Sequence, residues 1–451
     1  MKEKCNEKKE QFKILVIGGL IDLQKAGNQV IKNTIYYFLK NNFQVVLTTA
    51  IPANYPNGLR GEAAFGDMHK GYTVYRPPKV VQKIFYLIRY FKNLFKTKKI
   101  YQVKKKNEHS LAPENYFADY STGVQFVYFL SWMGYQIFGL IQGLFVSLKE
   151  NPDLFYGFEV YGAPVAGILG KILRKPVITR FQGTALDIKL KKSWKSRYLY
   201  HMLGLKAFSN AIVMSNDGTQ GKEALQELGV PEHKINFWLD GFSLEDTYLD
   251  PKEVNEIKSK WGLKDKKVLL CVNKLKIWKR IDRAIYVLYK LKKDYQLKDV
   301  VLMIVGDGPE RKNLENLVDC YQVQDSVKFA GAVSHEKIIN YFSFADAFLL
   351  FNDVSNLGNQ LLEALYLGLP IISLKDGSTD GLLKNNYNSL LVPPDRLEKD
   401  LPKAVYKILT DKDLDGKLSE NARITGKEKI LSWEKRMEKE VKLINSLLKN
   451  Q

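Results

Sequence analysis

Two lysines in the second half of the sequence stand where an anion could bind. Lys274 and Lys279 follow the apolar run Val268–Val272, and Lys279 falls where the next helix is expected to begin. A cation at the N-terminus of a helix opposes the helix dipole, so it is disfavoured unless an anion lies nearby. We therefore predict a diphosphate site here, with a solvated basic face as the alternative.

A second group of residues offers polar contacts at a loop-to-helix junction. The segment Ser355–Leu365 opens with small polar residues and glycine, which supply helix caps and exposed N–H donors. Glu363 falls in the first turns of this otherwise apolar helix, either as a surface residue or as an acceptor for ribose hydroxyl groups. The loop Lys375–Thr379 is of the small-residue type that cradles phosphate.

Glycines mark a further loop near the start of the chain. Gly18 and Gly19 follow the first apolar run, and Gly27 precedes the next helix. Glycines there let a ligand approach the backbone, and the N-terminus of the helix offers unpaired N–H groups. The spacing is not the GxGxxG fingerprint, so a nicotinamide cofactor gains no support.

Strands and helices must position these loops, and the signals for the two alternate along the sequence. Apolar runs predict buried parallel strands, helix-period segments separate them, and this βαβ pattern occurs twice. We therefore predict an α/β fold with two doubly wound, Rossmann-like domains that bind ligands at the carboxyl ends of their strands. The predicted strands are 12–17, 43–48, 154–156, 176–180, 211–214, 268–272, 300–305, 327–329, 347–351, 370–373 and 389–392, and the predicted helices include 29–40, 194–208, 281–292, 311–321 and 361–367.

The length of 451 residues favours more than one domain. The polar stretch Asp240–Leu263 is the best boundary, because it contains two glycines and a proline between strongly patterned segments. We place the first domain at 1–240, a linker at 241–262 and the second domain at 263–431.

The charge balance favours an anionic partner. Lysine and arginine outnumber aspartate and glutamate by 69 to 49, which gives a net charge of +20. The segment Lys79–Lys106 holds ten basic residues, no acidic residue and six aromatic side chains. This mixture suits an anionic membrane surface, and a solvated helix with one packed apolar side fits it about equally well. Nucleic acid is not expected, because no recognised reader motif is present.

The uncharged segment Tyr120–Leu148 is 29 residues long and contains the spacing Gly139-xxx-Gly143, which permits close helix packing. We expect a buried or membrane-dipping helix here rather than a membrane span, because a span would split the first domain. The charged N-terminus shows no apolar signal core, which predicts a cytoplasmic protein. Three scattered cysteines indicate incidental thiols in a reducing compartment, not a disulfide framework or a metal site: Cys5, Cys271 and Cys320.

Short motifs that follow one another in a set order and at set spacings cover most of Val268–Asp395. Together they resemble the C-terminal domain of the retaining GT-B glycosyltransferases of family 4 (glycosyltransferase group 1), and the first half resembles the family more loosely. The segments that carry the resemblance are 272–285, 305–310, 327–333, 341–350, 352–370 and 388–393 in the second half, and 18–27, 181–184 and 228–231 in the first.

The resemblance implies roles for individual residues. Lys279 matches the family lysine that holds the donor diphosphate, and Lys274 stands where a partner arginine is usual. Glu363 matches the second glutamate of the family's E-x7-E signature, which contacts the nucleotide ribose, and we take these three as the candidate catalytic residues. Further implied contacts are Gly27, Asn273, Gly306, Gly308, Ser355, Asn356, Leu357, Gly358 and Asn359 on the donor side, and Gly19, Gln182, Gly183 and Asp187 on the acceptor or sugar side.

Two positions depart from the family pattern. Ser355 occupies the place of the first glutamate of the signature, and Asp353 is the nearest carboxylate that a shifted loop could supply. Gln182 replaces the histidine of the His-Gly turn found in many relatives. Aspartates at DxD spacing, Asp411, Asp413 and Asp415, lie far from these motifs and are interpreted as solvated charges.

The resemblance implies a retaining transfer from a nucleotide-diphosphate sugar, held between two facing domains, to a lipid-linked or surface-polysaccharide acceptor. It implies no obligatory metal and no cofactor, since lysines and helix N-termini would stabilise the departing diphosphate. With the basic segment, it places the enzyme on the cytoplasmic membrane face, and residues 432–451 as a terminal helix that returns to the first domain. The alternatives are a catalytically silent nucleotide-sugar-binding or partner subunit, which Ser355 and Gln182 favour, and a nucleotide-sugar 2-epimerase.

Overall fold

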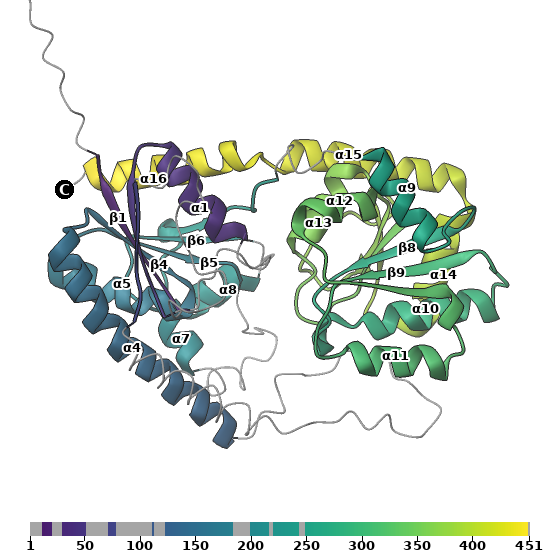
Figure 1. Cartoon of the computed structure of the whole chain (residues 1–451), viewed down its shortest axis with the longest axis horizontal. Helices are drawn as coiled ribbons and strands as arrows, with labels where there is room; N and C mark the ends of the chain where they lie inside the picture. Colours follow the sequence, from purple (N-terminus) through teal and green to yellow (C-terminus); the bar gives the residue numbers. More distant parts are fainter. Residues whose placement is uncertain are drawn as a thin grey trace, which may run out of the picture.

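The structure is a computed structural model in which two α/β halves lie side by side (Figure 1). It describes residues 11–19, 29–50, 71–77, 111, 122–183, 199–215, 220–242 and 249–449. Each half is built on one parallel sheet with helices on both faces, so the prediction of two doubly wound, Rossmann-like sheets is confirmed. The basic segment 79–106 lies outside the described residues.

The first sheet has seven strands in the order β3-β2-β1-β4-β5-β6-β7. All its neighbouring strands are parallel, so their carboxyl ends lie at one edge. The sequence misses β3 and β7, because these edge strands are short and only partly buried. The bounds are β1 Lys13–Gly18, β2 Gln44–Thr49, β3 Tyr72–Tyr75, β4 Leu154–Phe158, β5 Val177–Phe181, β6 Ala211–Met214 and β7 Ile235–Phe237.

Helices cover both faces of this sheet. One face packs against α1 and the C-terminal helix α16, and the other packs against α4 and α5. The described part of the predicted helix 194–208 is the shorter α7. The bounds are α1 Gln29–Lys40, α4 Thr122–Glu150, α5 Glu159–Leu173, α7 Leu199–Leu205, α8 Gln220–Glu227 and α16 Trp433–Lys449, with a 3-10 turn, η4, at Glu232–Lys234.

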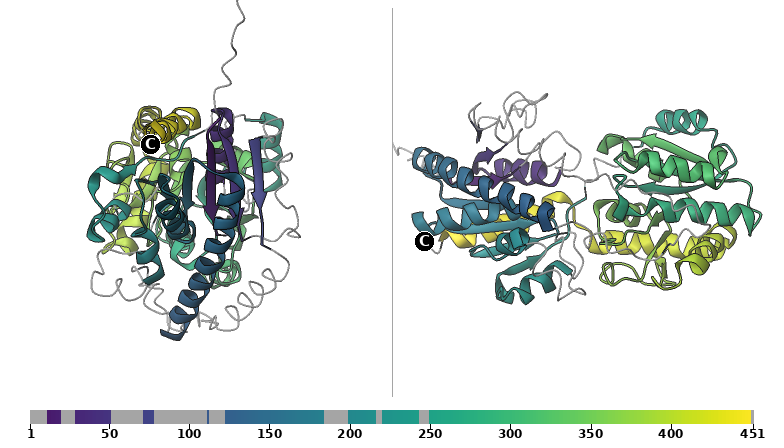
Figure 2. Two further views of the ribbon diagram at one scale, coloured as in Figure 1. Left: turned by 90° about the vertical axis from the view of Figure 1, so that its left-hand side faces the viewer. Right: turned by 90° about the horizontal axis from the view of Figure 1, so that it is seen from below.

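The long helix α4 lies along the outside of the first half (Figure 2). Its glycine pair packs within the protein: a Cβ on Gly139 would lie 3.0 Å from Val165 of α5, and one on Gly143 would lie 2.6 Å from Leu169. Among the described residues, one stretch, Tyr128–Glu150, is long and apolar enough to cross a membrane by length and composition alone, and about 33% of its most apolar part is buried. Because one side of α4 is fixed to α5 and the sheet, we interpret it as a packed helix with an outward face.

The second sheet has six parallel strands in the order β10-β9-β8-β11-β12-β13. Its strands are β8 Lys267–Val272, β9 Val300–Val305, β10 Val327–Gly331, β11 Ala347–Leu350, β12 Ile371–Leu374 and β13 Ser389–Val392. Its helices are α9 Pro251–Lys260, α10 Ile281–Lys293, α11 Arg311–Cys320, α12 His335–Ser343, α13 Asn359–Leu367, α14 Leu397–Thr410 and α15 Lys412–Lys429, with 3-10 turns η6 Ile277–Lys279 and η7 Gln324–Ser326.

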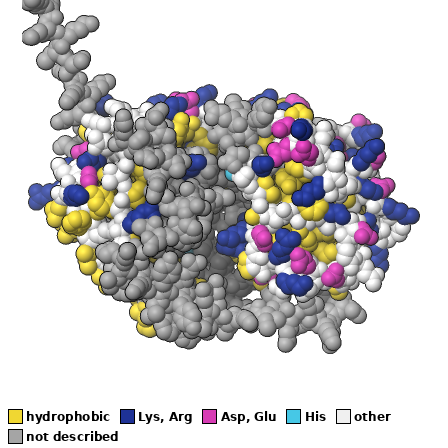
Figure 3. Space-filling model, viewed as in Figure 1, with side chains coloured by type: hydrophobic (Ala, Val, Ile, Leu, Met, Phe, Trp, Pro, Cys, Tyr) yellow, Lys and Arg dark blue, Asp and Glu magenta, His cyan; other side chains and the backbone are white. Residues whose placement is uncertain are grey.

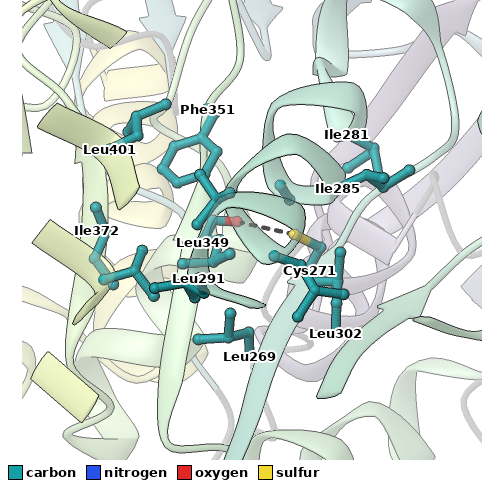
Figure 4. Close-up of a cluster of buried hydrophobic side chains, with 14 of the residues drawn as sticks. Leu269, Cys271, Ile281, Ile285, Leu291, Leu302, Leu349, Phe351, Ile372 and Leu401 are labelled. Carbon is teal, nitrogen blue, oxygen red and sulfur yellow. Dashed lines mark hydrogen bonds between the residues drawn. The ribbon is translucent and has the colours of Figure 1, made fainter. Parts of the chain in front are cut away.

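The core of the second half is closely packed. Leu269, Cys271 and Leu349 lie on adjacent strands beneath α10, and the Cys271 thiol donates to the Leu349 carbonyl oxygen at 3.6 Å (Figure 4). Cys271 is buried and Cys320 exposed, and both are free thiols. Cys5 lies outside the described residues.

Among the described residues, Phe242 and the start of α16 lie where the chain passes between the halves. Phe242 pairs with the start of α16, because its N–H donates to the Leu431 carbonyl at 2.9 Å. From there α16 runs along the first half (Figure 2) and buries Trp433, Met437 and Ile444 in its core. The predicted linker 241–262 contains α9, which packs against α12 of the second half.

Candidate active site

The loop after β8 carries both candidate lysines. Lys274 is exposed, whereas Lys279 closes the 3-10 turn η6 and is partly buried. The next helix, α10, begins at Ile281 after Arg280, which has a left-handed φ of 47°, so Lys279 lies just before the helix rather than in its first turn. The Trp278 carbonyl accepts the N–H of Asp353 at 3.0 Å, which ties this loop to the loop after β11.

The Lys279 ammonium group is a poorly compensated charge. Its Nζ lies 4.2 Å from the centroid of the Trp278 ring, and within the described ranges no carboxylate contacts it. Burial, with a smaller effect of Lys276, lowers the pKa of Lys279 to about 7. A half-buried cation without a counter-ion indicates a site for an anionic ligand.

The glycines after β9 allow the loops after β8 and β9 to pack closely. Gly306 has a φ of 132°, and a Cβ on it would lie 1.9 Å from the carbonyl oxygen of Asn273. A Cβ on Gly308 would lie 2.3 Å from the carbonyl oxygen of Leu275. Only glycine fits at such distances, so both residues hold the β9 loop against the lysine loop. Their predicted contact with the donor stays a prediction.

The loop between β11 and α13 is fixed by a buried amide. The Asn356 side chain accepts from the N–H of Asn352 at 2.9 Å, and donates to Asp376 at 2.8 Å. The backbone N–H of Asn356 donates to Ser378 Oγ at 3.0 Å. The loop after β12 thus holds the loop that leads into α13, whose first N–H groups have no partners within the helix.

Ser355 serves this loop as a local hydrogen-bond acceptor. Its Oγ accepts the backbone N–H of Leu357 at 3.2 Å, and its carbonyl accepts the Asn352 side chain at 2.8 Å. Gly358 is the N-cap of α13, and Asn359 is its first residue. Ser355 therefore braces the turn from which the helix begins.

Asp353 does not replace the missing glutamate. It is 3% exposed and pairs with Arg280 at 3.0 Å and with Arg283 at 2.6 Å. Arg283 also donates to the backbone carbonyls of Leu111 and Phe351. Asp353 is thus part of a buried ion cluster beneath the loop, which is a structural role that the sequence does not reveal.

Glu363 lies in the second turn of α13 and is buried. Its Oε1 is 3.7 Å from His335 Nδ1 at the start of α12. Gln360, one turn before it, donates to Asn273 Oδ1 at 3.3 Å. The loop after β8, the start of α12 and helix α13 therefore bring Asn273, His335 and Glu363 to one edge of the second sheet.

Three residues predicted for the acceptor side follow β1 and β5, the two strands that flank β4 in the first sheet. Gly19 follows β1, and Gln182 and Gly183 follow β5. The backbone N–H of Gln182 donates to Glu159 at 2.8 Å. Two other predicted residues, Gly27 and Asp187, lie outside the described residues.

Sequence reasoning missed Glu159 and His335, which belong to no motif and whose positions depend on contacts between loops. Gln360, Asp376 and Ser378 lie in the segments Ser355–Leu365 and Lys375–Thr379 that the sequence singled out, but their contacts could not be predicted. The partial signal for Asp376 and Ser378 is their place in the small-residue loop Lys375–Thr379. Asp411, by contrast, caps α15 by accepting the Leu414 N–H at 3.0 Å.

Comparison with known proteins supports the assignment of the second half. Residues 253–425 match the model of the family described as glycosyl transferases group 1. The alpha-D-kanosaminyltransferase of Streptomyces kanamyceticus is 28% identical over 167 residues, which is 37% of this chain and 42% of that protein. The alpha-monoglucosyldiacylglycerol synthase of Acholeplasma laidlawii is 27% identical over 177 residues, which is 39% of this chain and 43% of that protein. The chain thus matches less than half the length of these two relatives.

The whole fold matches solved structures. Anabaena HepE, solved in complex with UDP-glucose, superimposes with a TM-score of 0.67 at 14% identity, over 97% of this chain and 100% of that one. At this identity the likeness shows the fold alone, and the fold is GT-B. The motifs after β8 and before α13 fall inside the matched family region. Residues 253–425 are therefore similar to the domain of the group 1 glycosyltransferases, and the rest of the chain shares the GT-B fold of the solved structures.

Proposed function

We propose that this protein is a retaining glycosyltransferase that moves a sugar from a nucleotide-diphosphate sugar to a lipid-linked or surface-polysaccharide acceptor, without an obligatory metal. One observation carries the proposal: Lys279 is a partly buried ammonium group without a carboxylate partner in the described part of the chain. It lies at the carboxyl edge of the second sheet, together with Lys274 and the start of α13. A diphosphate would supply the missing negative charge.

Each group at this edge has a role in such a transfer. Lys279 and Lys274 neutralise the diphosphate as the sugar–oxygen bond breaks, and the N–H groups at the start of α13 add partial positive charge. Glu363 accepts hydrogen bonds from the ribose hydroxyl groups. The braced turn Ser355–Gly358 presents backbone N–H groups to the donor sugar, and because these groups are fixed before binding, they need no reorganisation during the reaction.

A uridine nucleotide is the first donor to test, because a protein of the same fold was solved with UDP-glucose. Purified protein is incubated with radiolabelled UDP-glucose, UDP-galactose and UDP-N-acetylglucosamine and with extracted membrane lipids. Transfer of label to lipid from one donor, with the anomeric configuration retained in the product and activity kept in EDTA, supports the proposal. Lack of both transfer and donor hydrolysis with every common nucleotide sugar would overturn it.

The alternatives give distinct outcomes in the same experiment. A silent binding subunit would bind the donor tightly and give no product. The donor would stay intact whether it is incubated with the wild-type protein or with Lys279→Ala. A 2-epimerase would convert the donor without any acceptor. Lys403→Ala, which removes an exposed lysine on α14, is the control and should leave transfer unchanged.

We place the enzyme peripherally on the cytoplasmic membrane face. The support is the outward face of α4, where Ile137, Ile141 and Leu148 are 57%, 67% and 72% exposed. Exposed apolar side chains in such a row mark a protein or membrane contact, and Figure 3 shows hydrophobic surface on the side where α4 lies. The net charge of +20 favours anionic lipids, and the Acholeplasma relative is named for a diacylglycerol lipid. The other exposed residues of this face are Phe126, Leu130, Met133, Leu144 and Phe145.

Vesicle flotation tests this location. Ile141→Asp should reduce binding to vesicles with about one third anionic lipid by roughly tenfold. The reason is that the new carboxylate would have to move from water into the membrane together with the exposed face of α4. Ile424→Asp on α15, a position 38% exposed on the other half, is the matched control. Equal binding by wild-type protein and Ile141→Asp would contradict a membrane contact through α4.

A further inference from the structure

The turn from β4 into α5 holds a strained acidic residue. Glu159 is the first residue of α5 and has a φ of 60°, whereas Phe158 before it is extended. A left-handed conformation is uncommon for a residue other than glycine, and such residues concentrate at functional sites. The chain thus has a glutamate at a position whose backbone conformation suits glycine better.

The position of this turn is central to the acceptor-side edge. In the first sheet, β4 lies between β1 and β5, and Phe158 is level with Gly18 on one side and Arg180 on the other. Glu159 therefore stands between the loop of Gly19 and the turn of Gln182, both of which the sequence assigns to the acceptor side. α5 begins close against β1, since a Cβ on Gly19 would lie 3.1 Å from Tyr161.

The Glu159 carboxyl group uses one oxygen within the protein. Its Oε1 accepts the backbone N–H of Gln182 at 2.8 Å, and its Oε2 contacts no donor among the described residues. The side chain is partly accessible. Burial raises the pKa of Glu159 to about 7, against the opposing effects of the Gln182 N–H and of Arg180. The anchored oxygen fixes the direction of the group, and the other oxygen is left for a ligand.

We infer that Glu159 binds a hydroxyl group of the sugar acceptor through Oε2 and so positions that acceptor for the transfer proposed above, on which this inference rests. A carboxyl group suits this task because it accepts a hydrogen bond from a hydroxyl group when ionised and can donate one when protonated. Gln182, which replaces the family histidine in the neighbouring turn, supplies only its backbone to this arrangement. Glu159 is thus a positioning residue for the acceptor.

The ionisable groups near Glu159 have pKa values far from 7, so the titration of Glu159 can be distinguished from theirs. Arg180 on β5 stays charged, and burial raises the pKa values of Tyr135 on α4 and Tyr161 on α5 above the ordinary value of 10. Burial lowers the pKa of His201 on α7 to about 4. Among the described groups on these elements, Glu159 alone should therefore titrate near neutral pH.

Steady-state kinetics with the acceptor that the lipid screen identifies tests the inference. Glu159→Gln should raise the acceptor KM about tenfold while the donor Kd from calorimetry stays within twofold. The dependence of kcat/KM for the acceptor on pH near 7 should disappear in this variant. Glu232→Gln, which changes an exposed carboxyl group of the same half, should match the wild type throughout.

A second variant separates positioning from folding. Glu159→Gly removes the carboxyl group and relieves the left-handed backbone, so its Tm should equal or exceed that of the wild type while its acceptor KM rises as in Glu159→Gln. An unchanged acceptor KM in both variants overturns the inference, as does a parallel loss of donor affinity or of Tm. If the wild-type protein transfers sugar to no acceptor, the proposed function fails instead, and the two failures are therefore distinct.

Discussion

Arg180 in the first half and Lys279 in the second are both cations withdrawn from water, but their surroundings differ. Arg180 is fully buried and pairs with Asp240 at 3.1 Å and Glu440 at 3.2 Å. The Nζ of Lys279 lies 4.2 Å from the centroid of the Trp278 ring, Lys276 further disfavours its charge, and no carboxylate among the described residues contacts it. A compensated buried charge holds structure together, whereas an uncompensated one marks the place of a missing anion. The comparison thus separates residues that maintain the fold from residues that are placed to bind a ligand.

The Arg180 cluster joins three parts of the chain. Glu440 on α16 also pairs with Arg436 at 2.5 Å and accepts the hydroxyl of Tyr156 on β4. Burial opposes ionisation of Glu440, but Arg180 and Arg436 outweigh it and hold its pKa below the ordinary value. Asp240 lies directly before the connection to the second half. The cluster therefore fixes α16 and the connecting segment to the first sheet.

The largest effect is expected where this compensation is removed. Glu440→Gln leaves Arg180 and Arg436 buried with too little negative charge, which should lower the free energy of unfolding by about 3–5 kcal/mol. Urea denaturation followed by circular dichroism measures the loss. Glu438→Gln changes an exposed carboxyl group on the same helix and should cost less than about 0.5 kcal/mol. Equal stability of the two variants would show that the cluster does not hold α16.

Sequence patterns could predict the sheets because their signal is local. β6, β9 and β13 match the predicted runs, since a continuous apolar segment between turns is visible without any knowledge of partners. The edge strands β3 and β7 carry no such run. The Arg180–Glu440 pair joins residues 260 positions apart, so no pattern along the chain predicts it.

The candidate site was predictable to the extent that its residues belong to motifs. Lys279 and Glu363 follow from their spacing within the family resemblance. Asp353 was a plausible substitute for the missing glutamate by proximity in sequence alone, and its pairing with Arg280 and Arg283 shows that proximity was misleading. Glu159 could not be found, because its signal is a backbone angle of 60° and a contact with the next strand.

Removing the uncompensated cation should affect binding and spare the fold. Lys279→Ala should weaken donor binding by about 10- to 100-fold, the worth of one or two hydrogen bonds to a charged group. The free energy of unfolding should stay equal or rise, because a desolvated charge is removed. Calorimetric titration with the donor and urea denaturation give the two values, with Lys403→Ala as the control. A large loss of stability in Lys279→Ala would place this lysine with Arg180 as a structural charge.

Donor affinity should also depend on pH through Lys279. In the free protein burial lowers the pKa of this lysine to about 7, and a bound diphosphate favours the charged form, so the pKa rises on binding. Affinity is therefore full below pH 7 and falls above it, by up to about tenfold per pH unit, until it reaches the level of Lys279→Ala. Lys279→Arg should bind with little change between pH 7 and 9, because a guanidinium group stays charged. A wild-type affinity that is constant over this range would contradict the expected titration.

The smallest effect is expected at Ser355, which braces a loop without compensating a charge. Ser355→Ala removes one neutral hydrogen bond, to the N–H of Leu357, so unfolding should become easier by about 1 kcal/mol or less, and donor affinity should change less than about threefold. Ser378→Ala is the informative contrast: Ser378 is 1% exposed and its Oγ accepts the Asn356 N–H while donating to Asp376, so its loss should cost about 1–3 kcal/mol. Denaturation and calorimetry on both variants rank them. If Ser355→Ala reduced donor affinity as much as Lys279→Ala does, the serine hydroxyl would have to contact the donor itself. Ser355 would then be a ligand-binding residue like Lys279 and not a residue that only maintains the fold.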